Sequence, residues 1–283
     1  MPGIGRRRAL MLGAAGLLPL SAAGYGAGRL LETMMTGDAQ TGRAWASDAA
    51  SGRLSARPGS PTDASATGEA GPTGLQPLGL GDQRDGLLYV PTGYRPDRPA
   101  PLVLTLHGAG RDARRGIEPL LGLADAFGLL LLAVDSRGRT WDVVLGGYGP
   151  DVAFLDRALA QTFARYAVDA SRVAVEGFSD GASYALSIGI ANGDLFSHIL
   201  GFSPGFAAPE ARAGQPRVFV SHGTGDQILP IDRCSRVLVP MMRQAGYDVT
   251  YREFDGPHVV PPEIVQEALA WFTGAPPADA TRG

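Results

Sequence analysis

The sequence contains no lysine, because all 25 of its basic residues are arginine. This absence excludes chemistry that needs a side-chain amine: a pyridoxal phosphate Schiff base, the lysine of a phosphate-binding loop, and a serine–lysine catalytic pair. Cysteine occurs once, at Cys234, so no disulfide can form within the chain. We expect Cys234 to be a small buried residue on a helix.

Histidine is also scarce, with four residues in the whole chain. No pair has the helical spacing of a zinc protease and no acidic cluster resembles a calcium loop, so we predict neither a metal nor a cofactor. The net charge of −3 shows no excess of basic residues of the kind that binds nucleic acid. Because histidines are so few, the candidates for a general base can be named in full: His107, His198, His222 and His258.

The N-terminus has the pattern of an export signal over residues 1–28. Arginines at 6–8 precede an apolar run over 9–20 that is too short to span a bilayer comfortably, and small residues follow at 21–23. The adjacent arginines resemble the twin-arginine form of bacterial signal. We therefore expect export to the periplasm or the exterior by that route, and no stable membrane insertion once the signal is removed.

Two further segments have compositions that do not favour a core. Residues 36–80 are rich in Gly, Ala, Ser, Thr and Pro with little periodicity, and the C-terminal segment has a similar composition. Such segments bury too little apolar surface to offset the entropy lost on ordering. We predict a low-complexity linker over 29–80, one folded domain over 81–273 and a disordered tail over 274–283.

Between these segments, apolar runs of strand type alternate with helical patterns. Leu102–Leu106 and Leu129–Val134 are continuous apolar runs, whereas 151–166 repeats apolar residues at spacings of three and four. Unbroken apolar strands are typical of a parallel sheet covered by helices on both faces. We predict such an α/β fold, with further strands at 87–90, 173–176, 199–202, 218–221 and 249–254 and helices near 117–127, 151–166, 181–191, 232–245 and 263–272.

The pentapeptide Gly177–Gly181 reads G-F-S-D-G, a G-x-S-x-G motif between a β-branched run and an Ala-rich run that suits a helix. The glycines permit a sharp strand-to-helix turn that leaves no room for Cβ atoms near Ser179. The serine then lies at a helix N-terminus, whose free N–H groups stabilise developing negative charge. We predict Ser179 as a catalytic nucleophile; the alternative is a Gly-rich turn with no catalytic role.

A nucleophilic serine on such a sheet needs an acid and a histidine that follow it in that order at later strand ends. His258 lies in a Gly-Pro loop after the last predicted strand, so we predict it as the base. His222 ends the strand 218–221 and is predicted to be a structural residue beside the acid. His198 precedes its strand and so lies at the wrong end of the sheet.

Asp226 follows the strand 218–221, at the place where the orienting acid belongs. It would fix the tautomer of the base and stabilise the imidazolium. Asp232 is the alternative, but its position near a helix start predicts a capping role. Asp255 is close to His258 in sequence, yet nothing places it at a strand end across the site.

Two backbone N–H groups are predicted to form the oxyanion hole. One belongs to Asp180, which follows the nucleophile, and the other to the glycine-rich turn after the strand Leu102–Leu106. Within that turn we choose Ala109 first and Gly110 second. The alternative is an ordinary turn that ends a strand.

The chain, from 84 to 272, resembles the α/β-hydrolase superfamily. Within it, the chain is similar to small bacterial phospholipase/carboxylesterase-type serine esterases and to secreted polyhydroxybutyrate-depolymerase-like esterases. The resemblance implies the triad Ser179, Asp226 and His258, in agreement with the residue-based choice, and an ester substrate. The stretches that carry it are 84–91, 106–110, 151–156, 177–181, 221–226 and 256–258.

The predicted function is an exported serine hydrolase that cleaves carboxylic esters. The connection 203–216 is short where many lipases insert a lid, so we expect no large lid and favour small or accessible esters. Trp141, Tyr148 and Phe178 are candidates for lining the pocket, or else for packing elsewhere. The alternatives are a serine peptidase or acyltransferase on the same fold, and a non-catalytic exported binding module.

Overall fold

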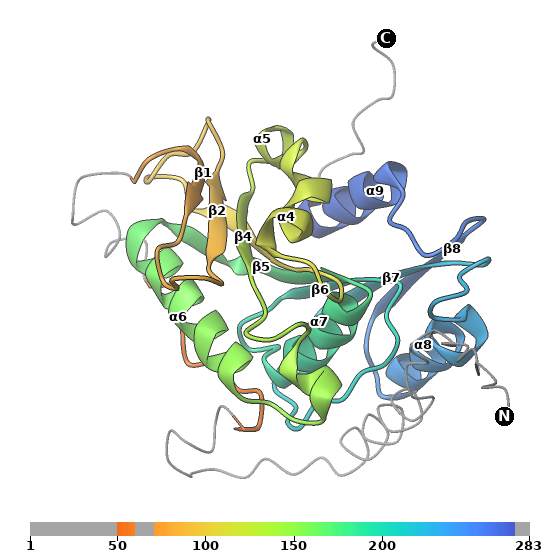
Figure 1. The fold of residues 1–283 in the computed structure, drawn as a ribbon. Coiled ribbons are helices and arrows are strands. Elements are labelled where there is room, and N and C mark those ends of the chain that lie inside the picture. The colour runs from red at the N-terminus through yellow and green to blue at the C-terminus, as the bar shows by residue number, and fades with distance from the viewer. Residues whose placement is uncertain (1–49, 60–70, 275–283) are drawn as a thin grey trace, which may run out of the picture.

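The computed structural model describes residues 50–59 and 71–274 (Figure 1). The predicted export signal over 1–28 therefore lies outside the described residues, as does the predicted tail beyond Gly274. For the described part of the chain, no helix is long and apolar enough to cross a membrane.

One twisted sheet forms the centre of the molecule (Figure 1). Its strand order is β1-β2-β4-β3-β5-β6-β7-β8; β2 pairs antiparallel with β1 and β4, and the ladder from β4 to β8 is parallel. The strands are β1 (Gly74–Pro77), β2 (Gly86–Val90), β3 (Ala100–Leu106), β4 (Leu130–Val134), β5 (Val168–Phe178), β6 (His198–Phe202), β7 (Arg217–Gly223) and β8 (Val249–Phe254).

Helices cover both faces of this sheet, as the unbroken apolar strands predict. The helices are α4 (Ala113–Leu121), α5 (Ala124–Phe127), α6 (Pro150–Arg165), α7 (Asp180–Ala191), α8 (Ser235–Gln244) and α9 (Pro262–Thr273), with 3-10 turns η1 (Asp142–Leu145) and η2 (Ile231–Arg233). Helices α6, α7 and α8 pack on one face and α4, α5 and α9 on the other.

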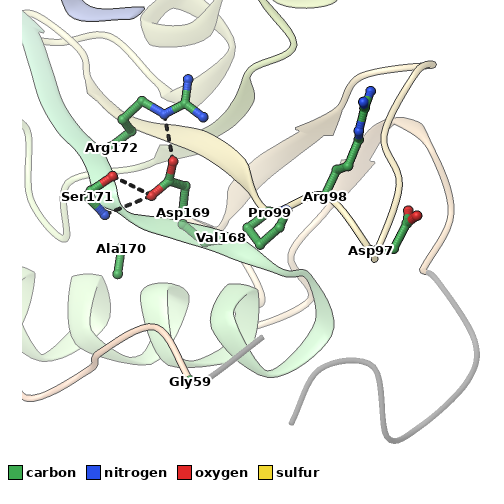
Figure 2. Close-up of a pocket in the computed structure, with 9 residues that line it drawn as sticks. All are labelled: Gly59, Asp97, Arg98, Pro99, Val168, Asp169, Ala170, Ser171 and Arg172. Carbon is green, nitrogen blue, oxygen red and sulfur yellow. Dashed lines mark hydrogen bonds and ion pairs between the residues drawn. The ribbon is translucent and has the colours of Figure 1, made fainter. Parts of the chain in front are cut away.

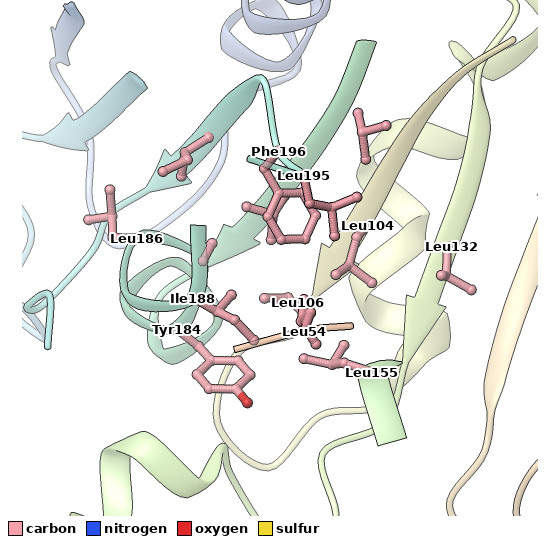
Figure 3. Close-up of a cluster of buried hydrophobic side chains, with 14 of the residues drawn as sticks. Leu54, Leu104, Leu106, Leu132, Leu155, Tyr184, Leu186, Ile188, Leu195 and Phe196 are labelled. Carbon is pink, nitrogen blue, oxygen red and sulfur yellow. The ribbon is translucent and has the colours of Figure 1, made fainter. Parts of the chain in front are cut away.

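Two hydrophobic clusters, one on each face, form the core. Neighbouring residues of a strand point to opposite faces, so Leu104 and Leu106 of β3 join the larger cluster and Val103 joins the smaller one. Figure 3 shows part of the larger cluster, with Leu155 of α6 and Ile188 of α7 close to these β3 leucines. The two layers fix the strands and hence the positions of the loops at their carboxyl ends.

The folded domain starts before residue 81, and the boundary predicted there is wrong. Strand β1 belongs to the sheet, and Leu54 is buried in the larger cluster. The backbone N–H of Leu54 donates to Asn192 Oδ1 over 2.8 Å, and Arg53 forms an ion pair with Asp194. The composition of the segment did not predict this packing, because 50–59 has no apolar pattern. One buried leucine and polar contacts hold it against the domain.

Other elements match their predicted ranges more closely. The helix expected over 117–127 is divided into α4 and α5, and the one over 232–245 begins as the turn η2 before α8. Cys234 is buried, as expected, and occupies the N-cap position of α8 without a capping hydrogen bond from its side chain. Residues 203–216 contain no helix or strand, in agreement with the expected absence of a large lid.

Candidate active site

The turn from β5 into α7 holds Ser179 in a strained backbone conformation, with φ of 58° and ψ of −121°. A Cβ atom on Gly177 would lie 2.2 Å from the carbonyl oxygen of Gly181, and one on Gly181 would lie 2.0 Å from that of Leu106. Both glycines are thus required by close backbone approaches. Positive φ at a non-glycine residue is costly and marks functional turns, and this turn places Ser179 at the carboxyl end of β5.

The structure brings the three predicted residues of the triad within hydrogen-bond distance. His258 Nε2 lies 2.9 Å from Ser179 Oγ, and His258 Nδ1 lies 2.6 Å from Asp226 Oδ2. The three side chains follow β5, β7 and β8 in the chain, and these strands lie on one side of the sheet with β6 between β5 and β7. The geometry is that of a serine whose proton can pass to an oriented imidazole.

Asp226 is buried and its carboxylate is held from several sides. Its Oδ1 accepts hydrogen bonds from the backbone N–H groups of Ile228 and Leu229, over 2.9 and 2.8 Å. His222 Nε2 lies 3.2 Å from the Oδ2 that faces His258. These contacts leave the carboxylate one orientation, in which it directs His258 toward Ser179.

His222 does not approach Ser179 and supports Asp226 from behind. Its side chain is fully buried, its Nδ1 lies 2.6 Å from Ser235 Oγ and its Nε2 lies 2.8 Å from the carbonyl oxygen of Leu229. Burial is the main cause that lowers the pKa of His222, which favours the neutral imidazole. The proton then belongs on Nε2, where it can be donated to Leu229 and Asp226.

Two backbone N–H groups near Ser179 have no acceptor among the described residues. Asp180 is the first residue of α7, so its N–H has no acceptor within the helix. No acceptor is recorded for the N–H of Ala109 among the described residues. Gly110 was the second choice, but its N–H donates to the carbonyl oxygen of Arg139 over 2.9 Å and is unavailable.

The turn that carries Ala109 is supported by His107 and Trp141, which the sequence offered as candidates for other roles. His107 is buried, and its Nε2 accepts a hydrogen bond from the backbone N–H of Ser136 over 3.0 Å. The indole N–H of Trp141 donates to the carbonyl oxygen of His107 over 2.8 Å. His107 is therefore a structural histidine whose ring anchors this turn to the loop after β4.

The remaining candidates lie away from Ser179. Asp232 does not cap a helix, contrary to prediction; its exposed side chain pairs with Arg236 over 2.7 Å, and Cys234 occupies the cap. Asp255 is exposed.

His198 begins β6, at the far end of the strands, and packs against Trp271 of α9. Burial lowers the pKa of His198 to about 4, as expected for an imidazole enclosed by apolar rings.

A cleft of about 530 Å³ opens beside Ser179 and His258. Phe178 lines it, and its ring lies 4.7 Å from the ring of His258, centre to centre. Trp141 is instead fully buried against Tyr184, and Tyr148 donates its hydroxyl to the carbonyl oxygen of Ala208. Of the three aromatic candidates, only Phe178 therefore lines this cleft.

Another cavity, of about 670 Å³, lies at the opposite end of β5 (Figure 2). Asp169 lies in its wall, bonded to Ser171 and paired with Arg172 over 2.6 Å. It contains none of the triad residues. No group of three or more metal-ligating side chains occurs among residues 50–59 and 71–274.

Comparisons with known proteins agree with this geometry. No protein family model matches the chain. Feruloyl esterase C of Emericella nidulans is 28% identical over 157 residues, which are 53% of this chain and 57% of that protein. The chain thus spans little more than half the length of this curated relative.

Solved structures share the fold at low sequence identity. The crystal structure of esterase PE8 superposes with a TM-score of 0.57 at 22% identity, covering 69% of this chain and 100% of that one. A ferulic acid esterase of Anaeromyces mucronatus superposes with a TM-score of 0.54 at 16% identity, covering 71% and 91%. The protein therefore has the α/β-hydrolase fold, and it is related in sequence to esterases.

Proposed function

We propose that the protein is a serine carboxylesterase that cleaves esters through an acyl-enzyme on Ser179. The observation that carries the proposal is the hydrogen-bonded series from Ser179 Oγ to His258 and on to Asp226, with distances of 2.9 and 2.6 Å. The esterase relatives support the same class of reaction.

In the acylation step, Ser179 Oγ attacks the ester carbonyl carbon while His258 Nε2 takes the hydroxyl proton. Asp226 stabilises the imidazolium through Nδ1. The tetrahedral intermediate then collapses, and His258 returns the proton to the alcohol that leaves. The acyl group remains on Ser179.

In the deacylation step, water attacks the acyl carbon and His258 Nε2 takes its proton. Collapse of the second intermediate releases the carboxylic acid and restores the Ser179 hydroxyl. The N–H groups of Ala109 and Asp180 hold the oxyanion in both steps. Each such donor is worth roughly 3 kcal/mol of transition-state stabilisation in other hydrolases.

The substrate is an ester that reaches an open site. The cleft is of a size suited to small organic ligands, and residues 203–216 add no helix or strand above it. Small carboxylic esters and feruloyl esters belong in the first substrate panel, the latter because of the feruloyl esterase relatives. A serine peptidase or acyltransferase would use the same acyl-enzyme, so amide substrates and alcohol acceptors belong in the panel as well.

Export by the twin-arginine route forms part of the proposal. It is supported by the arginines at 6–8 and the apolar run over 9–20. N-terminal sequencing of the protein recovered from the periplasm or medium tests it. A mature protein that begins beyond the apolar run is expected, whereas an intact Met1 would contradict cleavage.

Hydrolysis of p-nitrophenyl butanoate tests the mechanism. Ser179→Ala is expected to lower kcat/KM by at least about 1,000-fold, because the nucleophile is lost while binding and the oxyanion donors remain. Ser171→Ala is the matched control, since this exposed serine lies at the other end of β5 and should keep wild-type activity. Undiminished hydrolysis by Ser179→Ala, with circular dichroism showing the same fold, would contradict the mechanism.

A further inference from the structure

The cleft beside Ser179 is lined deep in the molecule by a glutamate of the central strand β5. Glu176 is one of the lining residues, although its side chain is only 3% exposed. Gly116 and Pro119 of α4 also line the cleft, and so does Ile228 from the loop that carries Asp226. A buried carboxyl group is thus part of the wall of the substrate cleft.

Glu176 lacks the partners that a buried carboxyl group normally has. Its Oε2 is inaccessible and has no hydrogen-bond partner among the described residues, and the ion pairs found in that part of the chain do not include it. Burial raises the pKa of Glu176 well above its ordinary value. A neutral carboxyl group can both donate and accept a hydrogen bond.

Thr105 places another unsatisfied polar group beside Glu176. The two residues are register partners on the adjacent parallel strands β3 and β5, so their side chains lie on the same face of the sheet. Thr105 is fully buried and its Oγ1 has no partner among the described residues. On the facing helix, Gly116 has no side chain, and a Cβ there would lie 3.5 Å from this hydroxyl.

Unsatisfied buried polar groups destabilise a protein, so this pair needs a function that apolar side chains could not serve. Phe178, the next residue of β5 on the same face, supplies an aromatic surface between Glu176 and the catalytic serine. Exposed Arg111 and Arg115 also line the cleft and disfavour a cationic ligand. The wall is therefore suited to a flat apolar group that ends in an uncharged hydroxyl.

We propose that Glu176 is a specificity-determining residue that hydrogen-bonds a hydroxyl group on the aromatic part of the ester. Thr105, its neighbour on β3, does not itself line the cleft. The inference rests on the proposed esterase function and names the substrate class, a hydroxyaryl ester. A site built to bond a hydroxyl discriminates strongly against the analogue that lacks it, because its buried polar groups are then left unpaired. The hydroxyl can belong to the acyl half or to the alcohol half of the ester.

The test uses pairs of esters that differ by one hydroxyl. Methyl 4-hydroxycinnamate and methyl cinnamate examine the acyl half, and 2-(4-hydroxyphenyl)ethyl acetate and 2-phenylethyl acetate examine the alcohol half. For each pair the measured quantity is the ratio of kcat/KM, hydroxylated over unsubstituted. We expect the wild-type protein to prefer the hydroxylated ester roughly 10- to 100-fold in at least one pair.

Two substitutions of Glu176 separate the effect of its hydrogen bond to the substrate from the effect of its side-chain shape. Glu176→Gln keeps a neutral donor and acceptor of the same size and should retain most of the preference. Glu176→Met has a similar shape without these groups, so the ratio should fall to about 1. Glu263→Met is the matched control, because this exposed glutamate of α9 does not line the cleft, and its ratio should equal that of the wild type.

Equal ratios in wild type and Glu176→Met, or a wild-type ratio near 1 in both pairs, would overturn the proposal. Because each ratio is taken within one variant, partial loss of folded protein does not affect it. Failure of the esterase function itself is distinguishable, since the wild type would then hydrolyse no ester in the panel and p-nitrophenyl butanoate would be stable.

Discussion

Asp226 illustrates how single side chains are constrained at this site. Its Oδ2 faces His258 Nδ1 at 2.6 Å, while two backbone N–H groups hold its Oδ1. The amide of an asparagine would place an N–H against one of these partners and favour the wrong tautomer of the imidazole. The role proposed for Asp226 therefore requires a carboxylate.

Asp226→Asn is expected to lower kcat by about 1,000- to 10,000-fold with p-nitrophenyl butanoate, as the loss of the orienting acid does in other triads. The measurement is a saturation curve at neutral pH. Asp232→Asn is the matched control, because Asp232 is exposed and pairs with Arg236 on the surface, and it should keep activity within about 2-fold. A large loss in Asp232→Asn with full activity in Asp226→Asn would reverse the assignment.

Much of the site at this scale could be predicted from the sequence. The flanking glycines led to the prediction of Ser179, and their order after later strands to that of Asp226 and His258; the structure brings the three side chains within hydrogen-bond distance. Gly110 was a wrong alternative because its bond to Arg139 joins two loops that are distant in sequence. The proposed role of Glu176 could not be predicted, because only the folded chain shows that residues of α4 and of the His258 loop line the same cleft as this glutamate.

At the scale of secondary-structure elements, residues 50–59 pack against the end of α7. Arg53 and Arg57 both pair with Asp194, over 2.8 and 2.6 Å, just beyond that helix. Burial alone would raise the pKa of Asp194, but hydrogen bonds from the two arginines outweigh it and lower the pKa to about 2. The ion pairs therefore favour the folded state only while Asp194 is ionised.

Asp194→Asn is expected to lower the free energy of unfolding at pH 6 by no more than about 1 kcal/mol, since the pairs are partly exposed and screened. Because the folded pKa is depressed, this loss should be full above pH 4 to 5 and shrink as pH falls from about 4 toward 2. Urea denaturation followed by circular dichroism at several pH values measures it.

Asp97→Asn is the matched control for the ion pairs of Asp194. Asp97 also pairs with an arginine, Arg95, but both side chains are well exposed. Its substitution should change the unfolding free energy little at any pH. A loss in Asp194→Asn that is equal at pH 6 and pH 2.5 would contradict the role given to the two arginines.

The elements that could be predicted are those with strong apolar patterns. The strands β3, β4, β6 and β7 are buried almost throughout, and β5 is buried over 173–177; apolar runs in these parts of the sequence predicted the strands. Strand β1 was missed because the sequence G-L-Q-P contains a glycine and a proline and is too short for a period to be seen. Its place depends on pairing with β2, a tertiary contact.

For the whole molecule, the sheet and its two helical layers hold the loops that carry Ser179, Asp226 and His258 at one edge of the sheet. The folded unit includes residues 50–59 and β1, which composition alone assigned to a linker. The reason is physical: a few buried leucines and polar contacts suffice to dock a segment on a domain that is already formed. The average composition of a segment does not reveal a few contacts of this kind.

Chains that begin at residue 50 and at residue 81 test this boundary. The shorter chain loses β1 and the buried side chains of Leu54 and Leu78, each worth roughly 2 kcal/mol of burial. We expect it to unfold at least about 3 kcal/mol more easily, or to be insoluble, whereas the chain from residue 50 should retain the described fold. Equal stability of the two chains would contradict the extended domain.

The account depends above all on Ser179 being a nucleophile activated by His258. The most direct measurement is mass spectrometry of the protein after reaction with a fluorophosphonate, which phosphonylates activated serines. We predict one added phosphonyl group, on the peptide that contains Ser179, and none in Ser179→Ala. An unmodified wild-type protein, or a label that persists in Ser179→Ala, would contradict the account.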